Sequence, residues 1–289
     1  MYPVDLVINV FERTYRDVLT PGFFRDIEAA NERPFDRKVV LINNVEDKPR
    51  VIELAQDLVE NGEITTYVVV EDHLAAALHN VGLTRSDLGR IPHYSDCVLV
   101  AIHLPGSPWL CYWDAEVRLE TPINWIDPAI ALMEQDSRVL VANPNWSVQG
   151  LEDEADEMTE DVALGYGFSD HVFLCRRADF RFPIYKYRTP SSLRYPLAHI
   201  NSVFEQRVDA YMRTHRKLRA TYRHAFYTHP DTEGHSYPAA SIGELLRYAT
   251  YQAVLAGVRS CSRWFSVQDP RLRTDGLVTR GRTPNNSRP

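Results

Sequence analysis

The sequence predicts an α/β fold in which a mainly parallel sheet is flanked by helices. Short apolar runs at residues 4–10, 38–42 and 64–70 indicate buried strands, and polar residues end each run. Between the last two runs, residues 48–61 carry apolar side chains at the spacing of an amphipathic helix. Such alternation of strands and helices is typical of parallel sheets with helices on both faces.

The remainder of the chain continues this alternation. We expect further strands at residues 95–104, 109–113 and 138–142, and regular structure resumes at residues 169–177. We expect further helices at residues 21–31, 74–81, 128–135, 201–219 and 242–258. The acidic segment 150–161 is interpreted as a solvated loop, and the polar residues from 275 onward as a disordered tail.

Charge and composition argue against several classes of protein. The net charge is −7 at pH 7, so we expect no nucleic-acid partner that binds through phosphate neutralisation. No stretch approaches about 20 uninterrupted apolar residues, and the first residues lack a basic and apolar leader. The four cysteines have no metal-type spacing and fit a reducing compartment. We therefore expect a cytoplasmic protein that contacts a membrane at most peripherally, on its inner face.

Two carboxylates end one of the predicted apolar strands. Asp114 and Glu116 follow residues 109–113 and are two positions apart, so in an extended chain they point to the same side. Paired hard oxygen ligands suit Mg²⁺ or Mn²⁺, which in turn holds phosphates. The alternative is a strand that ends in a solvated acidic turn, because Asp-x-Glu is a common pattern.

Polar residues also follow the first three predicted strands. They are Phe11-Glu12-Arg13, Asn43-Asn44 and Glu71-Asp72. In open α/β sheets, ligands bind beyond the carboxyl ends of the strands. We therefore expect these residues to gather at one edge of the sheet together with the acidic pair.

With this order of strands and the acidic pair near residue 115, the sequence resembles the GT-A glycosyltransferases, closest to those of the family-2 kind. The resemblance covers roughly residues 4–235. It implies a GT-A (Rossmann-like) domain over residues 1–235, with a nucleotide-sugar-binding half (1–117) and an acceptor-binding half (118–235). A helical segment (236–274) and a disordered tail (275–289) would follow. Asp114-Ala115-Glu116 would be the counterpart of the family's Asp-x-Asp metal motif, from which Glu116 departs.

The resemblance also implies roles for residues further along the chain. Asp170, in the segment 165–174, matches the acidic residue at the start of a helix that deprotonates the acceptor hydroxyl in inverting members. Its alternative role is that of a helix N-cap without chemistry. His229 matches a late histidine that binds the metal or diphosphate, with His235 as the alternate; a lone histidine is more often structural.

The nucleotide-sugar would contact the ends of the predicted strands. The residues that the resemblance places there are Val10, Phe11, Glu12, Arg13, Asn44, Asp72, Trp113 and Asp114. Phe11 would face the nucleobase and Arg13 would reach the diphosphate. Each of these residues can equally serve packing or surface roles, and for Trp113 a place in the core is the stronger alternative.

The implied activity is transfer of a sugar from a nucleotide-diphosphate sugar to an acceptor hydroxyl, with Mn²⁺ or Mg²⁺ as cofactor. The acceptor is open: a saccharide, a lipid-linked sugar or a small molecule. Inversion is preferred because Asp170 is a candidate base, and retention stays open. One alternative is a sugar-phosphate nucleotidyltransferase, although residues 9–14 lack its glycine-rich loop. Another is a binding protein that kept the fold without catalysis.

Overall fold

The computed structural model describes residues 1–146, 155–195, 198–200, 204–229, 241–265 and 269–273. Their centre is a mixed sheet with the strand order β3-β2-β1-β4-β9-β6-β10-β8-β7, and β5 pairs with β10 beside it. The strands are β1 (Val4–Val10), β2 (Arg37–Ile42), β3 (Thr66–Val69), β4 (Trp109–Asp114), β5 (Arg118–Leu119), β6 (Val139–Asn145), β7 (Ala155–Met158), β8 (Val162–Gly165), β9 (Val172–Arg176) and β10 (Leu218–Thr228).

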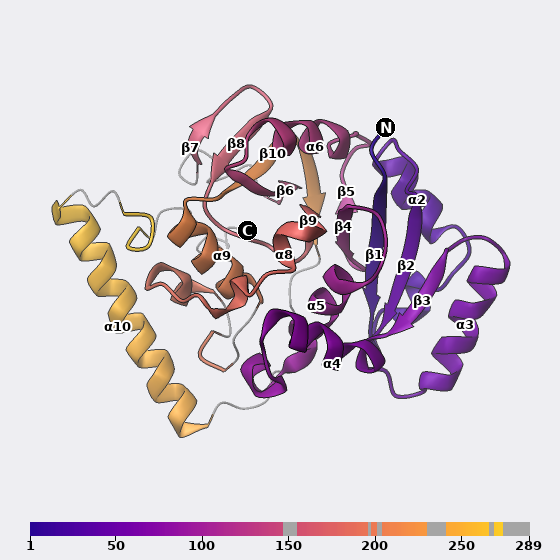
Figure 1. Ribbon diagram of the computed structural model, residues 1–289, viewed down its shortest axis with the longest axis horizontal. Coiled ribbons are helices and arrows are strands. Elements are labelled where there is room, and N and C mark those ends of the chain that lie inside the picture. Colours follow the sequence, from indigo (N-terminus) through magenta and orange to yellow (C-terminus); the bar gives the residue numbers. More distant parts are fainter. Residues whose placement is uncertain (147–154, 196–197, 201–203, 230–240, 266–268, 274–289) are drawn as a thin grey trace, which may run out of the picture.

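Most strands of the sheet point in one direction. Strands β3, β2, β1 and β4 pair in parallel, and β6 pairs in parallel with β10. Strand β9 lies between β4 and β6 and runs antiparallel to both. The carboxyl ends of β1, β2, β4 and β10 therefore meet the start of β9 at one edge of the sheet, as Figure 1 allows the reader to follow.

Helices cover both faces of the sheet, because its strands bury side chains alternately on either side. On one face, α2, α3 and α6 pack with Leu6 and Ile8 of β1, and on the other α4, α5 and α9 pack with Val7. The helices are α1 (Tyr15–Val18), α2 (Phe23–Ala30), α3 (Lys48–Glu60), α4 (Val70–Val81), α5 (Asp96–His103), α6 (Ile126–Gln135), α8 (Arg177–Phe180), α9 (Phe204–His215) and α10 (Ile242–Phe265). Short 3-10 turns are η1 (Arg85–Leu88), η2 (Pro92–Tyr94), η3 (Ile184–Lys186) and η4 (Ser191–Arg194).

The structure confirms the predicted α/β class and the mainly parallel sheet between helices, and it corrects three elements. Residues 95–104 form helix α5, whose residues from Asp96 to Ile102 are all buried, so the apolar run is a buried helix and not a strand. The helix expected over 201–219 is α9, and Leu218 already begins β10. Part of the acidic segment expected as a loop forms β7, which pairs with β8.

Several expectations lie outside the described residues. They are the rest of the acidic segment up to residue 154, the boundary at residue 235 together with His235, and the tail 275–289. Among the helices that the structure does describe, none has the length and apolar character needed to cross a lipid bilayer.

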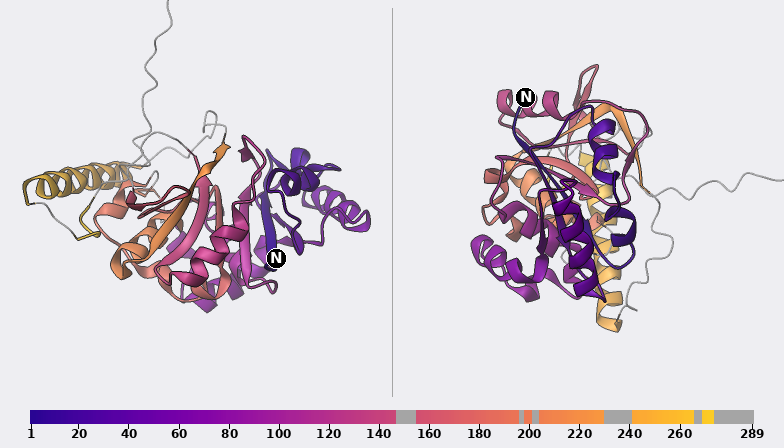
Figure 2. Two further views of the ribbon diagram at one scale, coloured as in Figure 1. Left: turned by 90° about the horizontal axis from the view of Figure 1, so that it is seen from above. Right: turned by 90° about the vertical axis from the view of Figure 1, so that its right-hand side faces the viewer.

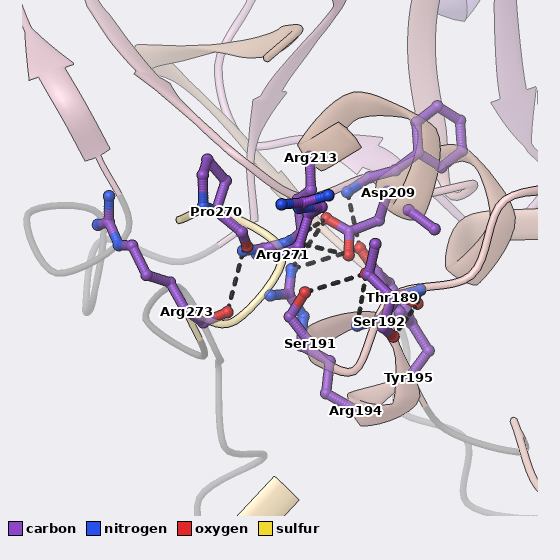
Figure 3. A network of polar contacts seen from close by, with 12 residues as sticks. Thr189, Ser191, Ser192, Arg194, Tyr195, Asp209, Arg213, Pro270, Arg271 and Arg273 are labelled. Carbon is purple, nitrogen blue, oxygen red and sulfur yellow. Dashed lines mark hydrogen bonds and ion pairs between the residues drawn. The ribbon is translucent and has the colours of Figure 1, made fainter. Parts of the chain in front are cut away.

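A buried polar network joins helix α9 to the chain after α10 (Figure 3). Asp209 accepts hydrogen bonds of 2.9 and 3.0 Å from Arg213 Nε and lies 3.5 Å from Arg194 of η4. Arg213 also donates to the carbonyl groups of Pro270 and Arg273, at 2.8 and 3.0 Å. One carboxylate and two carbonyl groups thus partner the buried guanidinium groups, and these contacts fix η4 against α9.

Candidate functional site

Asp114 ends the central strand β4, where the chain turns toward β5. The five preceding residues of β4 are buried, and Asp114 is partly exposed. Its Oδ1 accepts a 2.8 Å hydrogen bond from the Glu116 backbone N–H, and Val117 N–H donates to the Asp114 carbonyl at 3.1 Å. This turn folds Glu116 back beside Asp114 at the carboxyl end of the sheet.

His229 reaches the same point from the end of β10. Strand β10 pairs with β5, and the register places Thr228 opposite Arg118, just after the acidic turn. The Nε2 atom of His229 lies 3.4 Å from Oδ1 of Asp114. One ligand atom from each of Asp114, Glu116 and His229 lies within 4.8 Å of the others. Three metal-type ligands from distant parts of the sequence therefore converge.

His171, at the start of β9, supports this cluster. Its ring stacks on that of His229, with centroids 4.1 Å apart and planes 6° apart. Its carbonyl accepts a 2.6 Å hydrogen bond from the Asp114 N–H, and its Nδ1 lies 3.5 Å from the Tyr227 hydroxyl. The edge of Trp146 packs against the same ring. Sequence reasoning missed His171, although it is adjacent to the predicted Asp170.

Asp170 lies in the loop that enters β9, and not at the start of a helix as the resemblance implied. The loop is held by Phe168, whose N–H donates to the Tyr195 hydroxyl at 2.9 Å, and by the Asp170 N–H, which lies 3.3 Å from Glu205 Oε1. Gly167 has φ of +129°, a conformation that L side chains rarely adopt. Helix α9 and the turn η4 therefore set the position of Asp170.

The two acidic side chains at this edge have opposite shifts of pKa. Burial raises the pKa of Asp170 to about 6, and the charge of Asp114 adds to this effect. Burial acts in the same sense on Asp114, but the hydrogen bond from His229, the Glu116 N–H and the neighbouring His171 outweigh it, so the pKa of Asp114 is lowered. One carboxylate thus stays ionised while the other accepts a proton near neutral pH.

A cavity of about 350 Å³ contains these groups. Of the predicted residues, seven besides His229 line it: Phe11, Glu12, Arg13, Asn44, Asp114, Glu116 and Asp170. A second cavity, of about 480 Å³, lies beside it and shares Glu116 and His229. The metal-type cluster therefore lies where the two cavities meet.

The loops after β1 and β2 form the far wall of the first cavity. The Glu12 N–H donates to the Asn44 carbonyl at 3.3 Å, and the Glu12 carboxylate accepts a 2.9 Å hydrogen bond from the Glu46 N–H. Asn44 has φ of +48°, in the left-handed region that asparagine tolerates well. Glu12 is therefore engaged with the protein itself, while Phe11 and Arg13 beside it line the cavity.

Three of the predicted nucleotide-sugar-binding residues do not line the cavity. Val10 and Trp113 are fully buried in the core, and the indole N–H of Trp113 donates to the Val117 carbonyl. Each sits one position from a residue that does line the cavity, so strand alternation turns its side chain to the opposite face. Asp72 is exposed in the first turn of α4, because β3 ends at Val69 and the helix begins at once.

The cavity also contains residues that were not singled out from the sequence. They are Asn9, His93, Tyr94, Cys97, Val98, Tyr112 and His171, whereas Asn43, which also lines the cavity, had been expected at this edge. Alternation in β1 and β4 would have indicated Asn9 and Tyr112, which are two residues from Phe11 and Asp114. No sequence signal places residues 93–98 there, because residues 95–104 had been interpreted as a strand.

The cluster of Asp114, Glu116 and His229 is chemically suited to a divalent cation. Two carboxylates and one imidazole form a mixed oxygen and nitrogen donor set that accommodates Mn²⁺. Ligands about 2.1 Å from one ion lie up to about 4.2 Å apart. Because the three atoms already lie within 4.8 Å of one another, small side-chain rotations complete the arrangement.

No protein-family model matches the sequence, and no curated protein matches it. Solved structures share its arrangement at low identity. One is GalNAc-T7 with UDP, GalNAc and Mn²⁺, at 13% identity over 88% of this chain and 48% of that one, with a TM-score of 0.47. Mouse xyloside xylosyltransferase 1 matches at 15% identity over 82% and 99%, with a TM-score of 0.45.

A third similar structure is glucosyl-3-phosphoglycerate synthase from Mycobacterium tuberculosis in complex with Mn²⁺, uridine diphosphate and phosphoglyceric acid. It matches at 10% identity over 89% of this chain and 78% of that one, with a TM-score of 0.42. The present chain spans about half the length of the GalNAc-T7 chain.

The architecture has the arrangement of strands and helices that the resemblance of the sequence to GT-A glycosyltransferases implies. A largely parallel sheet lies between helices, and Asp-x-Glu ends its central strand. An antiparallel strand follows in the sheet order and brings a further acidic residue to the same edge. The fold class predicted from the sequence is therefore confirmed.

Proposed function

We propose that this protein transfers a sugar from a nucleotide-diphosphate sugar to an acceptor hydroxyl, with a divalent cation as cofactor. The observation that carries the proposal is the convergence of Asp114, Glu116 and His229 within 4.8 Å, at the wall of a cavity that also holds Asp170. A metal-type cluster and a candidate base on one cavity are the two parts that such a transfer needs.

The donor would lie along the strand ends. Phe11, Asn43 and Asn44 line the part of the cavity formed by β1 and β2, where an aromatic face and amide groups suit a nucleoside. The diphosphate would then reach the acidic cluster, which holds the cation. When bound, the cation would neutralise the charge that develops on the departing diphosphate. Arg13, at the rim, provides an additional positive charge for phosphate oxygens.

Asp170 would act on the acceptor. As the bond between the anomeric carbon and the diphosphate oxygen breaks, the acceptor oxygen forms the new bond to that carbon, and its proton passes to the Asp170 carboxylate. A pKa of about 6 leaves this carboxylate largely ionised at neutral pH and more basic than an ordinary aspartate. Attack from the side opposite the leaving group inverts the configuration at the sugar.

Donor binding and donor hydrolysis test this proposal together. Calorimetry with uridine and guanosine diphosphates, each as the free diphosphate and as a sugar conjugate, should show binding that requires Mn²⁺ and is lost with excess chelator. Asp114→Asn should abolish this dependence, whereas Asp57→Asn, an exposed change on α3, should leave it intact. A transferase should also hydrolyse its own nucleotide-sugar donor slowly, and the free sugar that this releases can be measured.

Three results would contradict the proposal. Equal affinity with metal and with chelator would remove the cation from donor binding. Tight binding of a conjugate without release of sugar in the presence of any acceptor would favour a binding protein. Release of pyrophosphate from a nucleoside triphosphate and a sugar phosphate would favour the nucleotidyltransferase alternative.

A further inference from the structure

Helix α10 contacts the rest of the protein along one narrow stripe. In this 24-residue helix, Glu244 and Leu255 are buried, and Tyr251 and Val258 are partly buried. Their spacing of seven, four and three residues puts all four on one side of the helix. Figures 1 and 2 show α10 at one end of the molecule, with most of its surface away from the sheet.

The start of α10 is fixed, so its orientation is defined. Glu244 N–H donates to the Ser241 hydroxyl, and the Glu244 carboxylate accepts a 2.8 Å hydrogen bond from the Ser241 N–H. This reciprocal pair is a capping box. The Glu244 carboxylate also forms an ion pair with Arg90, which ties the cap to the segment between η1 and η2.

The opposite side of α10 is apolar and exposed. Ile242, Leu245 and Leu246 are 79%, 54% and 65% exposed, and Ala249, Ala253 and Ala256 continue the stripe. Residues 242, 246, 249, 253 and 256 recur at alternating steps of four and three, so they lie on one face about half a turn from the packed stripe. A helix held on one side therefore presents a second apolar face with no covering element among the described residues.

The charges of α10 indicate what covers this face. Its sequence contains three arginines and one glutamate, and that glutamate is the one buried against Arg90. Arg259 is exposed on a flank of the apolar face, whereas Arg247 lies beside the packed stripe and donates to the His199 carbonyl at 3.2 Å. The protein as a whole has a net charge of −7. Two copies of the helix would bring arginines together without acidic partners, whereas anionic phosphate headgroups complement them.

We infer that α10 is a docking helix for an anionic lipid surface, lying in the plane of the interface. Its apolar face would enter the boundary between headgroups and acyl chains, and Arg259 beside that face would contact lipid phosphates. The apolar face is exposed from residue 242 to residue 256, which agrees with this placement. The inference concerns a surface remote from the acidic cluster and does not depend on the proposed sugar transfer.

Flotation of the full-length protein with vesicles tests the inference. We expect binding to vesicles of phosphatidylcholine with about 30% phosphatidylglycerol to exceed binding to phosphatidylcholine alone by roughly tenfold or more, and to weaken as salt is added. Arg259→Gln should weaken binding to the anionic vesicles roughly fivefold, as expected for one arginine near such a surface. Absence of binding to anionic vesicles would overturn the inference.

Two alanine substitutions form a matched pair. Ala253→Glu places a charge on the outward face of α10, and Ala76→Glu places the same charge on the exposed side of α4. We expect only Ala253→Glu to reduce vesicle binding, by tenfold or more, while both variants keep the wild-type melting temperature. Equal vesicle binding by the two variants would overturn the inference. Sedimentation of the wild type as a dimer that Ala253→Glu alone dissociates would also overturn it, because a second copy would then cover the face.

Discussion

The imidazole rings of His171 and His229 lie face to face, with centroids 4.1 Å apart and planes only 6° apart. His171 precedes β9 and His229 follows β10, so the stack joins two strands that do not pair with each other. One ring is a candidate metal ligand, and the other is its support. The stack fixes the plane of His229 so that Nε2 faces Asp114.

The stack predicts that His171 contributes to metal affinity without binding the metal itself. His171→Ala removes the support and should weaken Mn²⁺ affinity by about tenfold or more, the usual effect of losing a group that orients a ligand. His171→Phe keeps an aromatic ring of similar shape and should restore most of the affinity. Calorimetric titration with Mn²⁺ measures both. If alanine and phenylalanine weaken binding equally, the stack does not orient His229.

Asp170 should act in turnover and not in donor binding. Asp170→Asn keeps the shape of the side chain but removes the base, so transfer should fall by about 10²–10⁴-fold while the Kd for the donor and Mn²⁺ stays nearly unchanged. Transfer assays and calorimetry on the same preparation separate the two effects, with Asp57→Asn as the control. Near-normal transfer by Asp170→Asn would exclude Asp170 as the base and would favour retention.

Asp96 predicts an unusual dependence of stability on pH. Burial raises its pKa to about 6, against the opposing hydrogen bond from Asn43, whereas in the unfolded chain the pKa returns to about 3.9. Between these values the unfolded chain loses a proton that the folded protein keeps, so the free energy of unfolding falls as pH rises from about 4 to 6. Above about pH 6 Asp96 is ionised in both states, so the free energy of unfolding stays at this lowered value.

Asp96→Asn removes this ionisation and should stabilise the protein at about pH 8 by about 3 kcal/mol, since the pKa differs by about two units and each unit corresponds to 1.36 kcal/mol. Near pH 4 the gain should be close to zero, because Asp96 is then protonated in both states. Urea denaturation at the two pH values measures the difference. The exposed Asp57→Asn should show no such dependence, and a gain of equal size at both pH values would contradict the assignment.

Gly167 should not tolerate a side chain. An added Cβ would lie 3.2 Å from a guanidinium nitrogen of Arg194 and 3.3 Å from one of Arg219, at a φ of +129° that strains any L residue. Gly167→Ala should lower the free energy of unfolding by about 1–3 kcal/mol and reduce transfer, because the loop carries Asp170. Gly62→Ala also has a positive φ, +71°, but meets open space, and should lower stability less. Thermal denaturation and transfer assays compare the two, and equal effects on transfer would refute the link to Asp170.

Periodicity predicted the early elements of the fold well. The run 4–10 became β1 with the same bounds, and 48–61 became α3. The prediction failed at residues 95–104, where Val98, Val100 and Ile102 favour a strand by propensity. Burial on all sides leaves no polar face, so helix and strand cannot be told apart by pattern in this segment.

The sequence predicted only part of the candidate site, because some of its residues follow a strand directly and others are brought to the same edge of the sheet by tertiary packing. Asp114 and Glu116 follow a strand directly, so local pattern locates them. His171 and the segment 93–98 reach the cavity only through the reversed direction of β9 and the packing of α5. Tertiary arrangement of this kind leaves no spacing signal in the chain. Val10 and Trp113 were chosen without regard to strand alternation, which turns them to the core.

Because β9 runs in the opposite direction, the site is built from two separate parts of the chain. One is the set of loops that follow the parallel strands, and the other is the loop that precedes β9. Parallel strands deliver to this edge only the residues that follow them, and those loops continue into the helices that cover the sheet. An antiparallel strand delivers the residues that precede it. Here these are the residues of the loop 166–171, which is not part of any strand-to-helix connection in the first half of the sheet. Replacing the loop that precedes Val172 would therefore change the surroundings of Asp170. The loops that follow β1 and β2, which include Asn44, would keep their sequence and structure.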